Sequence, residues 1–293
     1  MTPELQRARR AVAPGRSSVR VAPGAVQAPR TVAVGSFQCR RATMAQAACA
    51  RSVRPNTLPN ECMSCRLRDF GLTVGLAPTE LDELDDAVTA RRKVAAGQTL
   101  YAAGDALRHV YAVRLGTFKT ALRTADGREQ ITGFQLQGEL LGIGAVGLDR
   151  HLTDAVALED SDVWMIPYAR LIDVGQRFPR VSHNLQRVLS QEVSAAQSTM
   201  LLLGRMSAEE RMAAFLLNLG QRYAALGWSG TEYTLRMSRE DIANYLGIKL
   251  ETVSRMLGRL QERGLVEIRQ RQVRILDACA LERVFDASVS CAE

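Results

Sequence analysis

The segment from Ser238 to Leu276 constrains the fold of this chain more than any other feature of its sequence. Its apolar residues recur at helical spacing in two short stretches, Ser238–Leu246 and Leu250–Arg263, with Gly247 between them. Ser238 can cap the first helix, and glycine commonly ends a helix because it adopts the left-handed conformation without strain. Two helices joined by a tight glycine-containing turn can place the second helix in the major groove of DNA. We therefore expect this segment to bind double-stranded DNA.

The second expected helix separates its apolar and polar side chains onto two faces. The apolar face holds Val253, Met256, Leu257 and Leu260, and the polar face holds Glu251, Ser254, Arg255, Arg259 and Glu262. Arg255 can donate two parallel hydrogen bonds to a guanine, Glu251 can accept one from a cytosine amino group, and Ser254 can bond either base edge. A solvated face with Glu–Arg pairs four residues apart would look similar. The helix and glycine turn that precede it favour base recognition.

A hairpin with a basic tip is expected directly after the second helix. The runs Gly264–Ile268 and Gln272–Leu276 flank the tip Arg269–Arg271. From Arg236 to Arg274 the chain has nine basic and five acidic residues, a surplus that suits a polyanion surface. The hairpin completes a winged helix-turn-helix domain at residues 207–285, before a tail at 286–293. Its further candidate DNA contacts are Arg239 and Arg271.

The net charge of +7 lies at the start of the chain. Residues 1–54 hold ten arginines and one acidic residue, Glu4, so the other 239 residues carry 28 basic and 30 acidic side chains. We expect residues 1–60 to form a disordered basic arm. An organellar transit peptide is the alternative, but prolines and glycines interrupt the amphipathic helix that such a peptide needs. Met44 is an alternative start to Met1.

Residues 61–178 have the pattern of a separate β-rich domain. After a short helix near residues 78–85, short apolar runs from Arg92 to Ile166 alternate with glycines, and Asp126-Gly127 is typical of a tight hairpin. Many short strands at this spacing indicate an antiparallel barrel or jelly roll. Hydrophobic residues make up 46% of the chain, enough for a packed core, yet no run approaches the roughly 18 apolar residues of a membrane helix. We expect an α+β protein that does not span a membrane.

A long helix is expected between the two domains, at residues 179–206. Its apolar residues follow three-four spacing, and no proline or glycine interrupts Val181–Leu203. A helix of this length needs a partner for its second apolar stripe, and a parallel copy of itself is the simplest one. Packing against its own barrel is the alternative, and both can hold on different faces. The candidate dimerisation residues are Leu185, Leu189, Val193, Ala196, Met200 and Leu203.

The segment Gly142–Gly147 matches the glycine pattern of dinucleotide-binding loops, so a nucleotide-dependent oxidoreductase is the alternative of another class. That motif needs a buried parallel strand before it and a long helix after it. The residues that follow Gly147 lead into another short strand instead, which favours a barrel turn. The three histidines His109, His151 and His183 lie far apart without a catalytic signature. We expect no enzyme.

Cys62 and Cys65 are a candidate metal-ligand pair, because two thiolates three residues apart can reach one zinc or cluster iron. Cys39 and Cys49 lie upstream and could complete four ligands; free surface thiols are the alternative. With no secretory signal and a large core, reduced thiols in a cytoplasmic protein are expected. Cys279 and Cys291 receive no role.

Several strings together resemble the CRP/FNR family of bacterial transcription regulators, closest to its FNR branch. They are Gly97–Leu100, Gly104-Asp105, Glu129–Phe134, Ala208–Phe215 and Glu251–Arg259. The resemblance covers about Cys62 to Val284 and implies a cyclic-nucleotide-binding-like sensory barrel, a dimerisation helix and a C-terminal winged helix. It also implies promoter binding as a homodimer and contact with RNA polymerase.

The chain departs from the family in both of its sensory sites. The cyclic-nucleotide branch uses a glutamate and an Arg-Ser pair where Ile143, Thr153 and Asp154 stand here. Cyclic AMP is therefore not the expected ligand, although a different small molecule could be. The FNR branch holds a [4Fe-4S] cluster through N-terminal cysteines and one barrel cysteine. Two of the matching positions here are Gly71 and Trp164, so oxygen or redox sensing does not carry over whole.

The expected operator follows from the same resemblance. Glu251, Ser254 and Arg255 match the reading triplet of the FNR branch, and Leu250 stands where the cyclic-AMP branch has another arginine. The resemblance predicts the palindrome TTGAT-N4-ATCAA. It does not predict which genes are regulated, or whether the protein activates or represses them.

Overall fold

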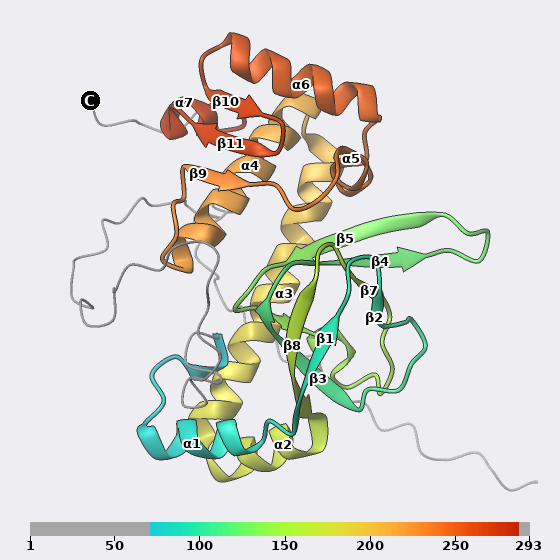
Figure 1. The fold of residues 1–293 in the computed structure, drawn as a ribbon, viewed down its shortest axis with the longest axis vertical. Coiled ribbons are helices and arrows are strands. Elements are labelled where there is room, and N and C mark those ends of the chain that lie inside the picture. The colour runs from blue at the N-terminus through green and yellow to red at the C-terminus, as the bar shows by residue number, and fades with distance from the viewer. Residues whose placement is uncertain (1–70, 287–293) are drawn as a thin grey trace, which may run out of the picture. The chain divides into compact units, whose positions relative to one another are not determined.

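The computed structural model describes residues 71–286 (Figure 1). The expected basic arm at residues 1–60 lies outside the described residues, as do residues 287–293. The described chain begins with a 3-10 turn at Gly71–Thr73 and helix α1 (Pro78–Asp86), which confirms the short helix expected there.

Two four-stranded antiparallel sheets form the first domain, in the orders β1-β8-β3-β6 and β2-β7-β4-β5. Their strands are β1 (Ala90–Val94), β2 (Thr99–Tyr101), β3 (His109–Leu115), β4 (Phe118–Arg123), β5 (Glu129–Gln135), β6 (Leu140–Leu141), β7 (Asp154–Ala157) and β8 (Ser161–Pro167). A shared core of Tyr101, Phe118, Val113 and Val163 joins residues from both sheets. The expected jelly roll is confirmed.

Two of these strands were not expected, because their sequences have no strand pattern of their own. In β1 the residues Ala90 to Lys93 are exposed and only Val94 is buried, and the strand exists through its pairing with β8. Strand β6 has two residues, which pair with Tyr111 and Ala112 of β3. Partners distant in the chain therefore define both strands.

The expected long helix is α3 (Pro179–Arg205), preceded by an unexpected helix, α2 (Tyr168–Arg177). The N-terminal half of α3 packs against the first domain, where Val181 and Leu185 share a core with residues of α1 and α2. Asn184 donates from Nδ2 to the carbonyl oxygens of Leu72 and Val74, at 2.8 and 3.0 Å. These contacts tie the first half of α3 to its own domain.

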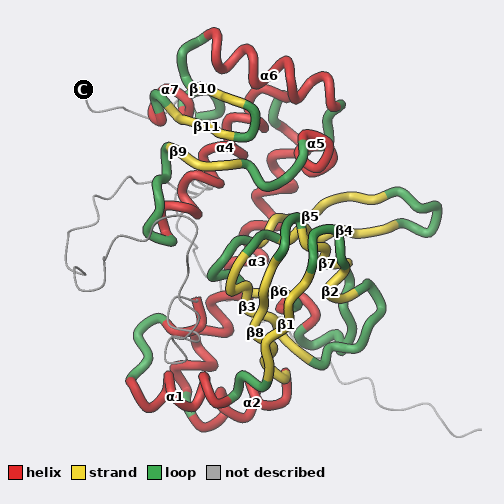
Figure 2. The backbone as a smooth tube through the Cα atoms, viewed as in Figure 1, coloured by secondary structure: helices red, strands yellow, loops and turns green. Residues whose placement is uncertain are grey.

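The second domain is the expected winged helix-turn-helix (Figure 2). Its elements are α4 (Ala208–Ala225), β9 (Glu232–Thr234), α5 (Arg239–Leu246), α6 (Leu250–Glu262), β10 (Val266–Arg269), β11 (Gln272–Ile275) and α7 (Ala278–Glu282). Ser238 caps α5 by accepting from the Asp241 backbone N–H, and Gly247 ends it in the left-handed conformation, with φ of 61°. Strand β9, which adds a third strand to the wing, and helix α7 were not expected. Within residues 71–286, no helix is long and apolar enough to cross a membrane.

Candidate nucleic-acid interface

Helix α6 presents the polar face that its sequence predicts. Val253, Met256, Leu257 and Leu260 are at most 3% exposed and pack into the domain core. On the other side, Glu251, Ser254, Arg255 and Arg259 are exposed. Three side chains that can read bases thus lie near the N-terminal end of one amphipathic helix, where recognition helices contact base edges.

Arg211 of α4 holds the ends of two helices beside this interface. Its Nη2 donates to the carbonyl of Leu203 at 2.7 Å, its Nε to Met206 at 2.9 Å, and its Nη1 to Leu246 at 2.8 Å. These carbonyls lie where α3 and α5 end, and the last carbonyls of a helix have no partner within it. One guanidinium therefore connects the end of the long helix to the helix-turn-helix. Sequence reasoning gave Arg211 no role, although it lies in a string that resembles the family.

The other predicted DNA contacts differ in how accessible they are. Arg271 is exposed on the wing, and its Nη1 lies 3.5 Å from the Arg236 carbonyl. Arg259 is exposed, with its Nη1 3.9 Å from a carboxylate oxygen of Glu209. Arg239 is half-buried in the first turn of α5. Of these three arginines, Arg271 and Arg259 are thus the more accessible for contact with DNA.

The predicted dimerisation residues fall into two groups. Val193 and Met200 are 58% and 73% exposed, and Ala196 between them is also exposed. Leu185 and Leu189 instead pack on the core of the first domain, and Leu203 packs on the core of the second. The uncovered apolar stripe of α3 is therefore the stretch from Val193 to Met200.

A cavity of about 180 Å³ is lined by Ile143 and Thr153, two of the positions matched above to residues of the cyclic-nucleotide branch. Thr120, Thr132, Gln135 and Glu192 are among its lining residues, and no lysine or arginine of the described chain lines it. Burial lowers the pKa of His151, another lining residue, which keeps its imidazole neutral at neutral pH. The cavity therefore offers a cyclic phosphate no cation.

Ile143 and Asp154, at two of the positions matched to the cyclic-nucleotide branch, have structural roles. Ile143 is 2% exposed within a 3-10 turn, and the Asp154 carboxylate accepts from Ala103 N at 2.8 Å and lies 3.1 Å from Arg123 Nε. Gly142 precedes this turn with φ of 84° and follows the two-residue antiparallel strand β6. A dinucleotide loop needs a parallel strand before it and a long helix after it, so the oxidoreductase alternative is wrong.

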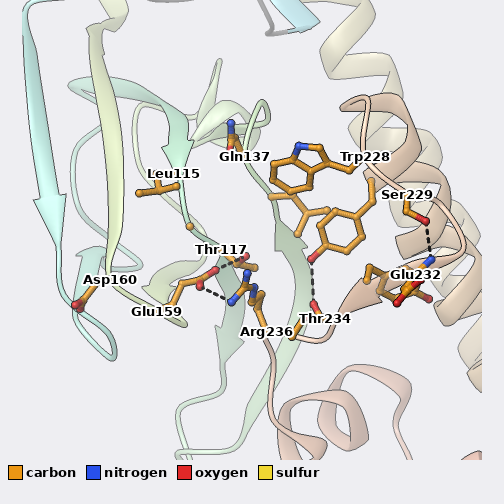
Figure 3. Close-up of a pocket in the computed structure, with 14 residues that line it drawn as sticks. Leu115, Thr117, Gln137, Glu159, Asp160, Trp228, Ser229, Glu232, Thr234 and Arg236 are labelled. Carbon is orange, nitrogen blue, oxygen red and sulfur yellow. Dashed lines mark hydrogen bonds and ion pairs between the residues drawn. The ribbon is translucent and has the colours of Figure 1, made fainter. Parts of the chain in front are cut away.

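A second cavity, of about 270 Å³, lies between the strands of the first domain and the loop after α4 (Figure 3). Glu159 accepts a hydrogen bond from Thr117 Oγ1 at 3.0 Å and lies 3.3 Å from Arg236 Nη1. Trp228 lies at this cavity with 52% of its surface exposed, and its ring stacks on that of Tyr223 with centroids 5.7 Å apart. The cavity is thus lined by both domains.

The predicted metal ligands Cys39, Cys49, Cys62 and Cys65 lie outside the described residues. Between residues 71 and 286, no group of three or more His, Cys, Asp or Glu side chains is arranged to hold a metal. Trp164, at the family's barrel-cysteine position, is half-buried with the Arg114 guanidinium 5.8 Å from its ring centroid. The described residues therefore do not fit a cluster held in the family's usual mode. Cys279 on α7 is disulfide-bonded, which differs from the reduced thiols expected.

A domain of two antiparallel sheets, a long helix and a winged helix-turn-helix with an exposed polar face on its second helix define a DNA-binding transcription regulator. Residues 91–178 match the cyclic nucleotide-binding domain, and residues 210–284 match the Crp-like helix-turn-helix domain. The chain belongs to the CRP/FNR family of transcription regulators, whose members are not enzymes.

Named relatives support this assignment. The transcriptional regulatory protein btr of Bordetella pertussis is 44% identical over 224 residues, which cover 76% of this chain and 93% of that protein. The fumarate and nitrate reduction regulatory protein of Escherichia coli is 40% identical over 223 residues, covering 76% of this chain and 89% of that protein. The structure of FixK2 from Bradyrhizobium japonicum is similar with a TM-score of 0.63 and 31% identity, covering 69% of this chain and 98% of that one.

Proposed function

We propose that this regulator binds the promoter palindrome TTGAT-N4-ATCAA as a homodimer in the cytoplasm and acts through contact with RNA polymerase. The observation that carries the operator is the exposed triplet of Glu251, Ser254 and Arg255 on α6. A homodimer suits a palindrome because a two-fold axis presents the same helix to each half-site. The uncovered stripe of α3 supplies a surface for that axis.

Binding of labelled duplexes at one fixed salt concentration tests the operator. The wild-type protein should prefer the palindrome over a scrambled duplex of the same composition, and Arg255→Ala should lose about 1 to 3 kcal/mol per half-site and relax selectivity at the guanine. Arg108→Ala removes an exposed arginine of the first domain and is the matched control. Equal affinity for palindromic and scrambled duplexes would contradict the proposed operator.

A regulator that answers a small molecule other than cyclic AMP is the second candidate. Gln135 Oε1 is buried without a hydrogen-bond partner in the described structure, and its side chain lines the 180 Å³ cavity. A buried acceptor of this kind favours an uncharged or cationic ligand that donates hydrogen bonds. Titration with cyclic AMP should leave operator affinity unchanged, and an increase would show that this account of the cavity is wrong.

A further inference from the structure

The outer edge of β5 is covered by helix α5 of the DNA-binding domain. Strand β5 is the last strand of its sheet, so the backbone groups on its free side need partners outside the sheet. Asn244 of α5 accepts from the Ile131 backbone N–H with Oδ1, at 2.6 Å, and donates from Nδ2 to the Glu129 carbonyl, at 2.9 Å. Its side-chain amide thus makes the pair of bonds that a neighbouring strand would make.

A third hydrogen bond joins the same two elements. Gln130 of β5 donates from Nε2 to the Asn244 carbonyl at 2.8 Å, which satisfies a group in the last turn of α5. Asn244 is half-buried, so loss of its amide would leave the β5 backbone groups with poorer partners. Alanine provides neither bond, and aspartate can accept from Ile131 but cannot donate to Glu129.

Lys119 of β4 joins the other end of α5 to the sheet. Its Nζ lies 2.8 Å from Asp241 Oδ1 and 3.3 Å from a carboxylate oxygen of Glu129. The same Asp241 caps α5 by accepting from the Ser238 backbone N–H at 3.0 Å. Burial alone would lower the pKa of Lys119, but Asp241 and Glu129 raise it, so the lysine stays charged at neutral pH. Both ends of α5 are therefore held by the β4–β5 pair.

The polar contacts surround a shared apolar core. The Phe134 ring of β5 lies 6.2 Å from that of Phe215 on α4 and 5.3 Å from that of Tyr245 on α5, between ring centroids. Ile131 also belongs to the core that holds the buried faces of α5 and α6. Figure 1 shows α5 beside these strands, with α6 beyond it. The reading face of α6 stays exposed in this arrangement, so the docked position is compatible with DNA.

We propose that Asn244 and Lys119 are positioning residues, which dock α5 on the β4–β5 pair and thereby set the half-site spacing that the dimer accepts. This rests on the proposed palindromic operator. A dimer must place its two recognition helices roughly 34 Å apart to read both half-sites on one face of DNA. A docked α5 holds α6 in one orientation. In a loosened domain, α6 must become ordered when DNA binds, which costs entropy, and the dimer also accepts other half-site spacings.

Asn244→Ala tests the docking through operator spacing. Affinities are measured for the N4 palindrome and for the same half-sites with an N6 spacer, at one salt concentration. The variant should bind the N4 site about tenfold more weakly and lose most of the wild-type preference for N4 over N6. Asn218→Ala, at an exposed asparagine of α4, is the matched control and should keep both values. An unchanged ratio of the affinities for the N4 and N6 duplexes in Asn244→Ala would overturn the proposal.

Two further variants separate docking from folding. Lys119→Met and Asn244→Asp should also lower the ratio of the N4 affinity to the N6 affinity. Lys93→Met, at an exposed lysine of β1, should leave this ratio unchanged. An effect of Lys93→Met equal to that of Lys119→Met would overturn the role given to Lys119.

Amide hydrogen exchange without DNA makes the test independent of the operator. In Asn244→Ala the Ile131 N–H should exchange at least about tenfold faster, while amides of β3 and α6 keep their protection and report an intact fold. Equal exchange of Ile131 in both proteins would overturn the docking. If the wild type fails to prefer the palindrome over the scrambled duplex, the proposed function fails, and the exchange result still decides whether Asn244 docks α5.

Discussion

Arg211 concentrates at one side chain the contacts that join the long helix to the DNA-binding domain. Its guanidinium donates to three backbone carbonyls, at distances of 2.7 to 2.9 Å. Arginine can do this because its donors are arranged in a rigid planar fork and it stays charged. A lysine presents a single ammonium group at the end of a flexible stem, so it would not reach all three carbonyls with the same geometry.

Arg211→Met should therefore lower the free energy of unfolding by about 3 kcal/mol, because it removes three charge-assisted hydrogen bonds and leaves carbonyls without partners. Urea denaturation followed by circular dichroism measures the change. Arg205→Met, at an exposed arginine in the last turn of α3, is the control and should cost under about 1 kcal/mol. Similar losses in the two variants would show that Arg211 stabilises the protein only through general charge effects.

At the scale of the element, α3 changes its partner along its length. Its first turns pack on the first domain, and Leu202 near its end is only 9% exposed, whereas residues 190–198 between them are all exposed. Ala196 lies between Val193 and Met200 on the exposed face, and its side chain is small. Small side chains permit two helix backbones to approach closely. The middle of α3 is thus the stretch suited to a second copy of the chain.

Met200→Asp should convert the expected dimer to monomer, because the two introduced carboxylates would face each other across the interface between the two α3 helices. The expected loss is about 2 kcal/mol or more of dimerisation free energy, visible by sedimentation velocity at micromolar concentration. Ser198→Asp places the same charge on the opposite side of the helix and should remain dimeric. A wild-type protein that is monomeric under these conditions would contradict the proposed homodimer.

At the scale of the whole molecule, the chain has the polar face of α6 that matches the family's reading helix, but it lacks the family's barrel cysteine. The DNA-reading face lies within the described chain, whereas the four cysteines predicted as ligands lie outside it. Trp164 stands where the family's usual mode of cluster binding has a cysteine, so the first domain contributes no thiolate there. Any cluster would therefore need a different ligand set.

Anaerobic purification followed by iron and sulfide analysis checks this expectation. The protein should contain well under one [4Fe-4S] cluster per chain, because a cubane needs four anchors and Trp164 replaces one of them. Cys62→Ser is the comparison variant and should leave operator affinity unchanged. Stoichiometric iron and sulfide in the wild type, both lost together with operator binding in Cys62→Ser, would instead establish oxygen sensing through an alternative ligand set.

The sequence by itself determined those features that depend on neighbouring residues. The two faces of α6, the Ser238 cap, the Gly247 turn and the hairpin at Asp126-Gly127 were all predicted, because helical period, capping and turn conformation act within a few residues. The reading face of α6 was predicted for the same reason. Exposed and buried residues recur along α6 with the period of an α-helix.

Tertiary structure alone decided the features that need a distant partner. Strands β1 and β6 exist because β8 and β3 supply their hydrogen bonds, and only folding divides the α3 stripe between its own cores and solvent. The docking of Asn244 on Ile131 joins residues 113 positions apart, and no local pattern links the two. Backbone groups at a sheet edge are satisfied by whichever element the whole fold brings beside them. That is why the contacts which hold α6 in place emerge only once the chain has folded.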